Sequence, residues 1–122
     1  MEGWSRLRAT NAYLQDASNP GLSVHTRLKC VWNAIYIVCW QAARRRGGPV
    51  FVDGPFDMHV LTEGLVALKV NMKEAMLIRR LADWSECIQP DVPNTLNLSQ
   101  LLTLAKTLSQ RFENCERFSH DG

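Results

Sequence analysis

Residues 30–40 read CVWNAIYIVCW, the most apolar stretch of the sequence. With its flanks, this stretch places apolar residues at the three- and four-residue intervals of an α-helix. The repeating positions are Leu28, Val31, Trp32, Ile35, Val38, Cys39 and Ala42. Because the helix is apolar on nearly every side, we expect neighbouring helices to cover it as the axis of the core. It contains Asn33 and falls far below the roughly 18 apolar residues that a membrane span requires.

Both ends of this central helix carry boundary signals. Ser23 is placed to cap its N-terminus. At the other end Arg44, Arg45 and Arg46 fall in the last turn, where positive charge is favoured, and the run 47–49, Gly-Gly-Pro, stops the helix. A shorter amphipathic helix is predicted over residues 4–17, before the stop signal Ser-Asn-Pro-Gly at residues 18–21.

Three more helices are predicted after the central one. Residues 49–55 lie between prolines and suit a loop or one edge strand, and residues 56–70 resume the helical period. Asn71 is placed to cap the next helix, with Glu74 completing a capping box, and prolines at 90 and 93 end it. The apolar side of that helix is expected to comprise Met72, Ala75, Met76, Ile78 and Leu81.

The final helix begins at Asn97 or Ser99 and extends to Phe118, and we expect residues 119–122 to form a frayed tail. The chain of 122 residues, 46% hydrophobic and 21% charged, has the size and composition of one folded domain. The sequence therefore predicts an all-α, five-helix up-and-down bundle that forms a single domain over residues 1–118.

No recognised catalytic or metal-binding signature is present in the sequence. The four cysteines lack a Cys-x-x-Cys spacing and a histidine at a ligand interval, and the three histidines lack local partners. We therefore expect no metal and no organic cofactor. Reduced cysteines, together with an N-terminus in which basic and apolar residues are interleaved, predict a soluble cytoplasmic protein without a membrane partner.

Two segments carry a family resemblance. Residues 32–36, WNAIY, form an aromatic-polar-alanine stretch, and residues 79–84, RRLADW, precede a proline-containing turn and a closing amphipathic helix. This pair, over roughly residues 4–117, resembles the HEPN superfamily of small helical bundles. Its ribonuclease members carry Arg-Asn-x-x-x-His in the second segment, and others carry a variant ending in an acid and an aromatic. Arg79 matches the motif arginine, Arg80 replaces the asparagine, and Asp83 and Trp84 match the variant.

Trp84 stands where the ribonuclease members have histidine, and an indole cannot transfer protons near neutral pH. Metal-independent RNA cleavage is therefore not expected. The resemblance implies a HEPN-like interaction module of bacterial kind that binds a toxin–antitoxin or nucleotidyltransferase-type partner. One alternative is an RNA-binding or RNA-processing protein that uses Arg79 and Arg80. Another is a secretion-type chaperone or a phage-encoded inhibitor.

The same residues also have a purely structural interpretation. Leu77, Ile78, Leu81 and Trp84 would line the core, while Arg79, Arg80 and Asp83 would form a solvated face with one Arg–Asp pair. A net charge of only +2 does not by itself indicate nucleic-acid binding. However, the arginines at 44–46 could join Arg79 and Arg80 in one phosphate-binding surface if their helices lie side by side.

Aromatic residues suggest where a partner would bind. A core of this size hides two or three of the four tryptophans, so Trp4 or Trp84 is a candidate anchor for a partner. The central helix could also leave Tyr36, Trp40 or Trp4 partly exposed, which would favour a two-fold homodimer. Alternatively, the third and fifth helices of the same chain cover these side chains.

Overall fold

The computed structural model describes the backbone of residues 2–45, 58–86 and 91–121, and the side chains of residues 8–45, 59–86 and 91–114. These residues form five α-helices and no strand: α1 (Glu2–Ala17), α2 (Val24–Arg45), α3 (Met58–Ala67), α4 (Met72–Ser85) and α5 (Leu98–Asp121). The prediction of an all-α bundle of five helices is confirmed for this part of the chain. The loop or edge strand expected at residues 49–55 lies outside it.

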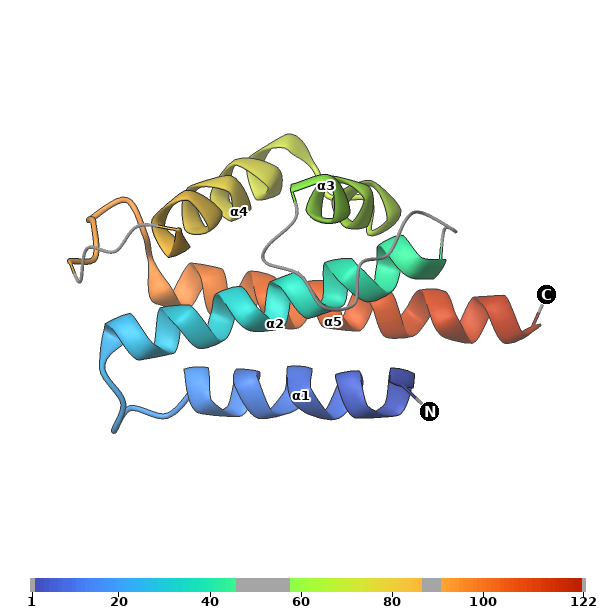
Figure 1. Ribbon diagram of the computed structural model, residues 1–122, viewed down its shortest axis with the longest axis horizontal. Helices are drawn as coiled ribbons and strands as arrows, with labels where there is room; N and C mark the ends of the chain where they lie inside the picture. The colour runs from blue at the N-terminus through green and yellow to red at the C-terminus, as the bar shows by residue number, and fades with distance from the viewer. Residues whose placement is uncertain (1, 46–57, 87–90, 122) are drawn as a thin grey trace.

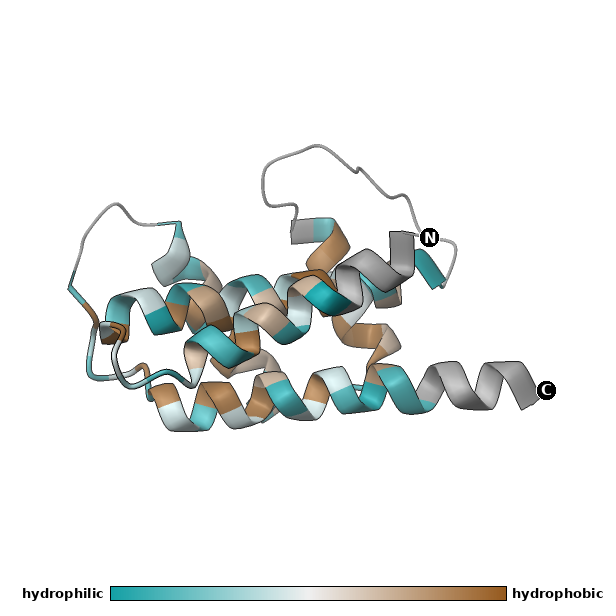
Figure 2. Cartoon of the chain, turned by 90° about the horizontal axis from the view of Figure 1, so that it is seen from below, coloured by the Kyte–Doolittle hydropathy of each residue, from teal (hydrophilic) through white to brown (hydrophobic). Residues whose placement is uncertain are grey.

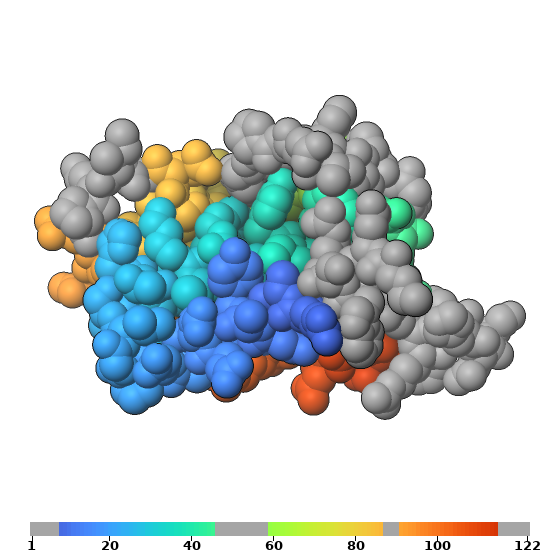
Figure 3. All heavy atoms as spheres, turned by 60° about the horizontal axis from the view of Figure 1, so that its bottom comes forward, coloured from blue at the N-terminus to red at the C-terminus, as the bar shows by residue number. Residues whose placement is uncertain are grey.

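The helices are arranged in three layers (Figure 1). α2 and α5 lie side by side in the middle and run in the same direction, α1 lies on one side of them, and α3 and α4 lie on the other. Figure 3 brings α1 forward and shows it lying against α2. α2 contacts all four other helices, so it is the central axis that its sequence predicts.

All five helices carry apolar residues, coloured brown in Figure 2, and their buried side chains form the core between these layers. Along α2, Leu28, Val31 and Ile35 are completely buried, and Leu101 and Leu108 of α5 pack into the same cluster. A single cluster reaches all five helices, with Ala17 contributed by α1 and Ile78 by α4. The hydrophobic effect of this shared core, rather than any one helix, holds the layers together.

Side chains fix the turn between α1 and α2. The Gly21 amide donates to Asn19 Oδ1 (2.9 Å), and the Thr26 amide donates to Ser23 Oγ (3.1 Å). The second bond confirms Ser23 as the cap of α2. Arg27 Nε donates to the carbonyl oxygen of Ala17 (2.8 Å), which satisfies an acceptor at the end of α1.

α3 crosses α2 at Gly64 (Figure 1). A Cβ at this position would lie 2.6 Å from both the Cα and the Cβ of Cys39. No side chain fits in that space, so glycine is what lets the two helix backbones approach. Cys39 is completely buried, and burial raises the pKa of its thiol to about 12, which leaves it unreactive.

The turn from α3 to α4 ends one helix and starts the next within four residues. Lys69 adopts a left-handed conformation (φ 56°), and the amides of Lys69 and Val70 donate to the carbonyls of Val66 and Leu65. This is the Schellman arrangement, and it ends α3 at Ala67 rather than at the predicted residue 70.

The first residues of α4 and α5 are capped by asparagine. Asn71 Oδ1 accepts from the Glu74 amide (2.8 Å), and Glu74 Oε1 accepts from the Asn71 amide (3.1 Å), which confirms the predicted capping box. Asn97 Oδ1 accepts from the Gln100 amide (3.0 Å), so Asn97 rather than Ser99 caps α5. α5 then continues to Asp121, three residues beyond the predicted end at Phe118, because no glycine or proline interrupts residues 119–121.

Candidate interaction surface

One side of α4 faces away from the bundle. Ile78, Leu81 and Ala82 of this helix are buried in the core. The opposite side is exposed, and we call it the α4 face; it consists of Met72, Lys73, Met76, Arg79, Arg80 and Asp83. The division follows helical periodicity, because residues three, four and seven apart share a side.

Two methionines stand out on the α4 face. Met72 is 78% exposed and Met76 is 51% exposed, although both were expected on the apolar side. That expectation is wrong because Leu81 follows Met72 by nine residues, which at about 3.6 residues per turn places the two on opposite sides of the helix. Of the described residues, the exposed large hydrophobics are these two, Val24 and Val66, and Val66 belongs to the last turn of α3.

Positive charge surrounds the methionines. Between residues 69 and 83 the exposed charged side chains are Lys69, Lys73, Arg79 and Arg80 against Asp83, or four basic minus one acidic, +3. Arg79 Nε lies 3.3 Å from Asp83 Oδ1, with both side chains about two-thirds exposed. This is the surface Arg–Asp pair of the structural interpretation, and such exposed pairs contribute little stability.

Shallow hollows lie on both sides of the α4 face. One, of about 220 Å³, is formed with α3 and is lined by Leu61, Thr62, Leu65, Ala75, Met76 and Arg79. A second, of about 290 Å³, is lined by Lys73, Met76, Leu77, Arg80, Thr95 and Gln100. A third, of about 390 Å³, continues from the second and is lined by Arg80, Asp83, Trp84, Asp91, Val92, Pro93, Thr95 and Leu96. Met76 therefore lines both the first hollow and the second.

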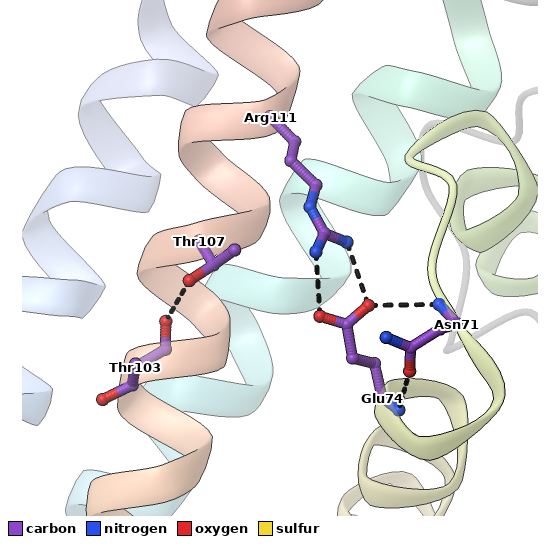
Figure 4. Close-up of polar contacts among 5 residues, drawn as sticks. All are labelled: Asn71, Glu74, Thr103, Thr107 and Arg111. Atoms are coloured by element: carbon purple, nitrogen blue, oxygen red, sulfur yellow. Dashed lines mark hydrogen bonds and ion pairs between the residues drawn. The ribbon is translucent and has the colours of Figure 1, made fainter.

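An ion pair fixes the start of α4 to α5 (Figure 4). Arg111 donates from Nη1 to Glu74 Oε1 (3.0 Å) and from Nη2 to Glu74 Oε2 (2.9 Å). Hydrogen bonding from Arg111 is the main reason why the pKa of Glu74 is lowered, with the Asn71 amide contributing against partial desolvation. Because Glu74 also completes the capping box, a single carboxylate positions the helix that carries the α4 face.

Trp84, a candidate interface residue, is mostly buried in the core, and its small exposed part lines the third hollow. Trp84 is 7% exposed, and its Nε1 donates to the carbonyl oxygen of Asp91 (3.1 Å). His25 meets its ring edge-on with centroids 5.2 Å apart, and Lys29 Nζ lies 5.0 Å from the ring while donating to the Ser85 carbonyl (2.9 Å). Trp84 thus joins α2 to the end of α4, as the structural interpretation predicts.

Of the motif positions taken from the HEPN resemblance, Arg80, Asp83 and Trp84 line the third hollow, and Arg79 lines the first. Arg79 belongs to the exposed α4 face, whereas Trp84, five residues later, points into the core. Arg79, Arg80 and Asp83 remain together as a surface cluster.

The aromatic candidates for self-association whose side chains are described, Trp40 and Tyr36, differ in their burial. Trp40 is not one of the aromatics left exposed: it is 4% exposed, because it packs with Ala43 and with Val60 of α3, as the alternative of coverage within one chain predicts. The Arg44 guanidinium lies 5.5 Å from its ring. Tyr36 is half-buried beside Trp32, with ring centroids 5.8 Å apart. The side chain of Trp4 lies outside the described residues.

The arginines at the end of α2 are separate from those of α4. The end of α2 and the end of α4 lie toward opposite ends of the bundle (Figure 1). Arg44 lies over Trp40, and the Arg45 guanidinium is 5.6 Å from the Phe112 ring on α5, so both cover the core at their own end of α2. Arg46 lies outside the described residues.

Neither a metal-ligand cluster nor a membrane-spanning helix is found among the described residues. In the described part of the chain, no three potential ligands among histidine, cysteine, aspartate and glutamate come together as a metal site would require. Cys30 and Cys39 are free and buried, and burial raises the pKa of both thiols. Among these residues there is also no helix with the length and apolar character needed to cross a bilayer.

No family model, curated protein or solved structure matches the chain. The resemblance to the HEPN superfamily therefore stays a prediction. Sequence reasoning selected Arg79, Arg80 and Asp83 of the α4 face but missed Met72, Met76 and Lys73. A helical projection of residues 72–83 contains the missing signal, because it places both methionines beside the arginines and away from Ile78 and Leu81.

Proposed function

We propose that this protein is a helical interaction module that binds a partner protein through the α4 face. The observation that carries the proposal is the pair of exposed methionines, Met72 and Met76, set among basic residues on a helix whose other side is buried. Methionine is unbranched and polarisable, and protein-binding surfaces use it to pack against varied partners. The anchoring of α4 through Glu74 and Arg111 keeps this surface in place.

A protein partner fits the α4 face better than RNA does. Among the described residues, the exposed large hydrophobics are methionine and valine, and none is an aromatic on which a base could stack. Arg79 is also engaged by a carboxylate, Asp83. If the HEPN resemblance holds, the partner is a nucleotidyltransferase-type or toxin–antitoxin component.

Co-purification from the cells that carry the gene tests this function. A tagged chain is compared with the double variant M72E/M76E and with T103E/Q110E, which adds the same charge at exposed positions of α5. We expect one protein to co-purify stoichiometrically with the wild type and the α5 variant, and to be lost from the α4 variant. Retention of that protein by M72E/M76E would contradict the proposal.

The same preparation also tests the alternatives. RNA that co-purifies with the chain and is lost in R79A/R80A would support the RNA-binding function instead. Incubation with structured RNA, with and without Mg²⁺, examines processing. We expect no cleavage, whereas cleavage that disappears in R79A would favour the enzyme.

A further inference from the structure

The second and third hollows form one groove along α4. Arg80 and Thr95 line both hollows, so the two adjoin and together follow the helix from Lys73 to Trp84, with residues 91–100 as the other wall. At about 1.5 Å per residue this length is about 16 Å, or three turns of an α-helix. A helix laid in the groove would contact apolar groups along its length: Met76 and Leu77 at one end, and Trp84, Val92 and Leu96 at the other.

Charge is distributed unevenly along this groove. Lys73 and Arg80 line the half near the start of α4, and in the described part of the chain no carboxylate forms an ion pair with either. Asp83 and Asp91, both exposed, line the opposite end together with Arg80, and Asp83 also pairs with Arg79. An occupant therefore needs negative charge at one end of the groove and positive charge at the other.

We infer that the groove receives an acidic amphipathic helix of the partner, lying antiparallel to α4. The inference rests on the proposed function. The occupant's carboxylates would face Lys73 and Arg80, and its N-terminus, where the helix dipole is positive, would lie at Asp83 and Asp91. Its apolar residues, spaced three and four apart, would pack on Met76 and Leu77.

Other occupants match the groove less well. A second copy that presented its own α4 face would bring Lys73, Arg79 and Arg80 of two chains together, and like charges repel. A nucleic-acid strand along the groove would place phosphates against Asp83 and Asp91. Only an occupant with opposite charges at its two ends meets both halves of the groove favourably.

The test uses the full chain, labelled with ¹⁵N, and a synthetic 18-residue peptide as probe. The peptide carries leucine at heptad a and d positions, glutamate at the exposed positions of its C-terminal half, and neutral residues elsewhere. A twin peptide has lysine in place of every glutamate. We expect the acidic peptide to shift the amide signals of residues 73–84 and 95–100, and to bind at least tenfold more tightly than its twin.

Matched variants locate the contact. R80E and K106E change the net charge equally, but Lys106 is exposed on α5 outside the groove. R80E and M76E should each weaken binding of the acidic peptide at least fivefold, whereas K106E should weaken it less than twofold. Equal binding of the two peptides, or equal effects of R80E and K106E, would overturn the inference.

A nitroxide label on the peptide tests the orientation. A label at its N-terminus should broaden the amide signals of Asp83 and Asp91, and a label at its C-terminus should broaden that of Lys73. The reverse pattern would overturn the antiparallel arrangement. The proposed function fails separately: if a partner protein is still lost from M72E/M76E while no acidic peptide binds, the α4 face binds a protein of different chemistry.

Discussion

The crossing of α2 and α3 and the outward face of α4 are built on opposite principles. At the crossing, Gly64 lies against the backbone of Cys39 with no room for one more carbon atom. On the α4 face, Met72 and Met76 extend into solvent beside hollows on both sides of the helix. The first region tolerates one arrangement of two helices, and the second leaves apolar surface uncovered. The fold therefore depends on the crossing, and the proposed binding depends on α4.

The largest effect is expected at the crossing. G64A should destabilise the protein by about 3 kcal/mol, because the added Cβ would overlap the Cα and Cβ of Cys39 and the two helices would have to separate. Alanine in place of glycine within a helix otherwise stabilises by about 1 kcal/mol, so the sign of the change is diagnostic. Urea unfolding followed by circular dichroism measures it. V66A, an exposed substitution two residues away, should change stability by less than about 0.5 kcal/mol.

The ion pair that positions α4 gives the next largest effect. E74Q should lower the free energy of unfolding by about 1–2 kcal/mol at pH 7, because the charge-assisted bonds from Arg111 weaken. Since the folded-state pKa of Glu74 is lowered, its carboxylate stabilises the fold above the ordinary value of 4.5, and this contribution is lost as the pH falls through the lowered pKa. The difference in the free energy of unfolding between wild type and E74Q should therefore disappear below pH 4.5. A difference that does not change with pH would contradict the stabilising role of the Glu74 carboxylate.

A substitution in the α3–α4 turn should act in the opposite direction. K69G is expected to stabilise the protein by about 1 kcal/mol, because lysine holds a left-handed conformation that glycine adopts without strain. Thermal unfolding measures the effect. The control is K73G, which also loses a lysine but at a position without the left-handed conformation. Lys73 lies in the first turn of α4, so K73G should instead destabilise by about 0.5 kcal/mol.

The smallest effect is expected on the α4 face itself. M72E/M76E should change the free energy of unfolding by less than about 0.5 kcal/mol, because both side chains are at least half exposed. A loss above about 1.5 kcal/mol in urea unfolding would mean that these methionines support the core. Substitutions at the crossing and on the α4 face would then no longer differ in kind in their effect on stability.

The fold could be predicted from sequence because its signals are local. Ser23, Asn71 and Glu74 act within one helical turn, and the apolar period of residues 28–42 is sufficient to identify the central helix. The end of α3 was placed three residues late because Lys69 occupies a left-handed position in which glycine is the usual signal.

The surface was harder to predict because it depends on which side of each helix the neighbours cover. Trp40 and Trp84 look like exposed anchors in the sequence, but α3 covers one, and His25, Lys29 and the Asp91 carbonyl enclose the other. Met76 looks like a core residue because it is apolar and near Ile78. Its exposure follows from its place on the helical projection of residues 72–83, on the side away from Ile78 and Leu81, which are buried.

Site-specific photo-crosslinking in the cells that carry the gene tests the central claim most directly. A photoreactive residue is placed singly at Met76 and Arg80 on α4, at Asn11 on α1, and at Thr103 and Gln110 on α5, all exposed. If the α4 face is the interaction surface, one protein adduct should form from positions 76 and 80 at a yield at least fivefold above the other three. Adducts of equal yield at all five positions, or adducts confined to α1 or α5, would contradict it.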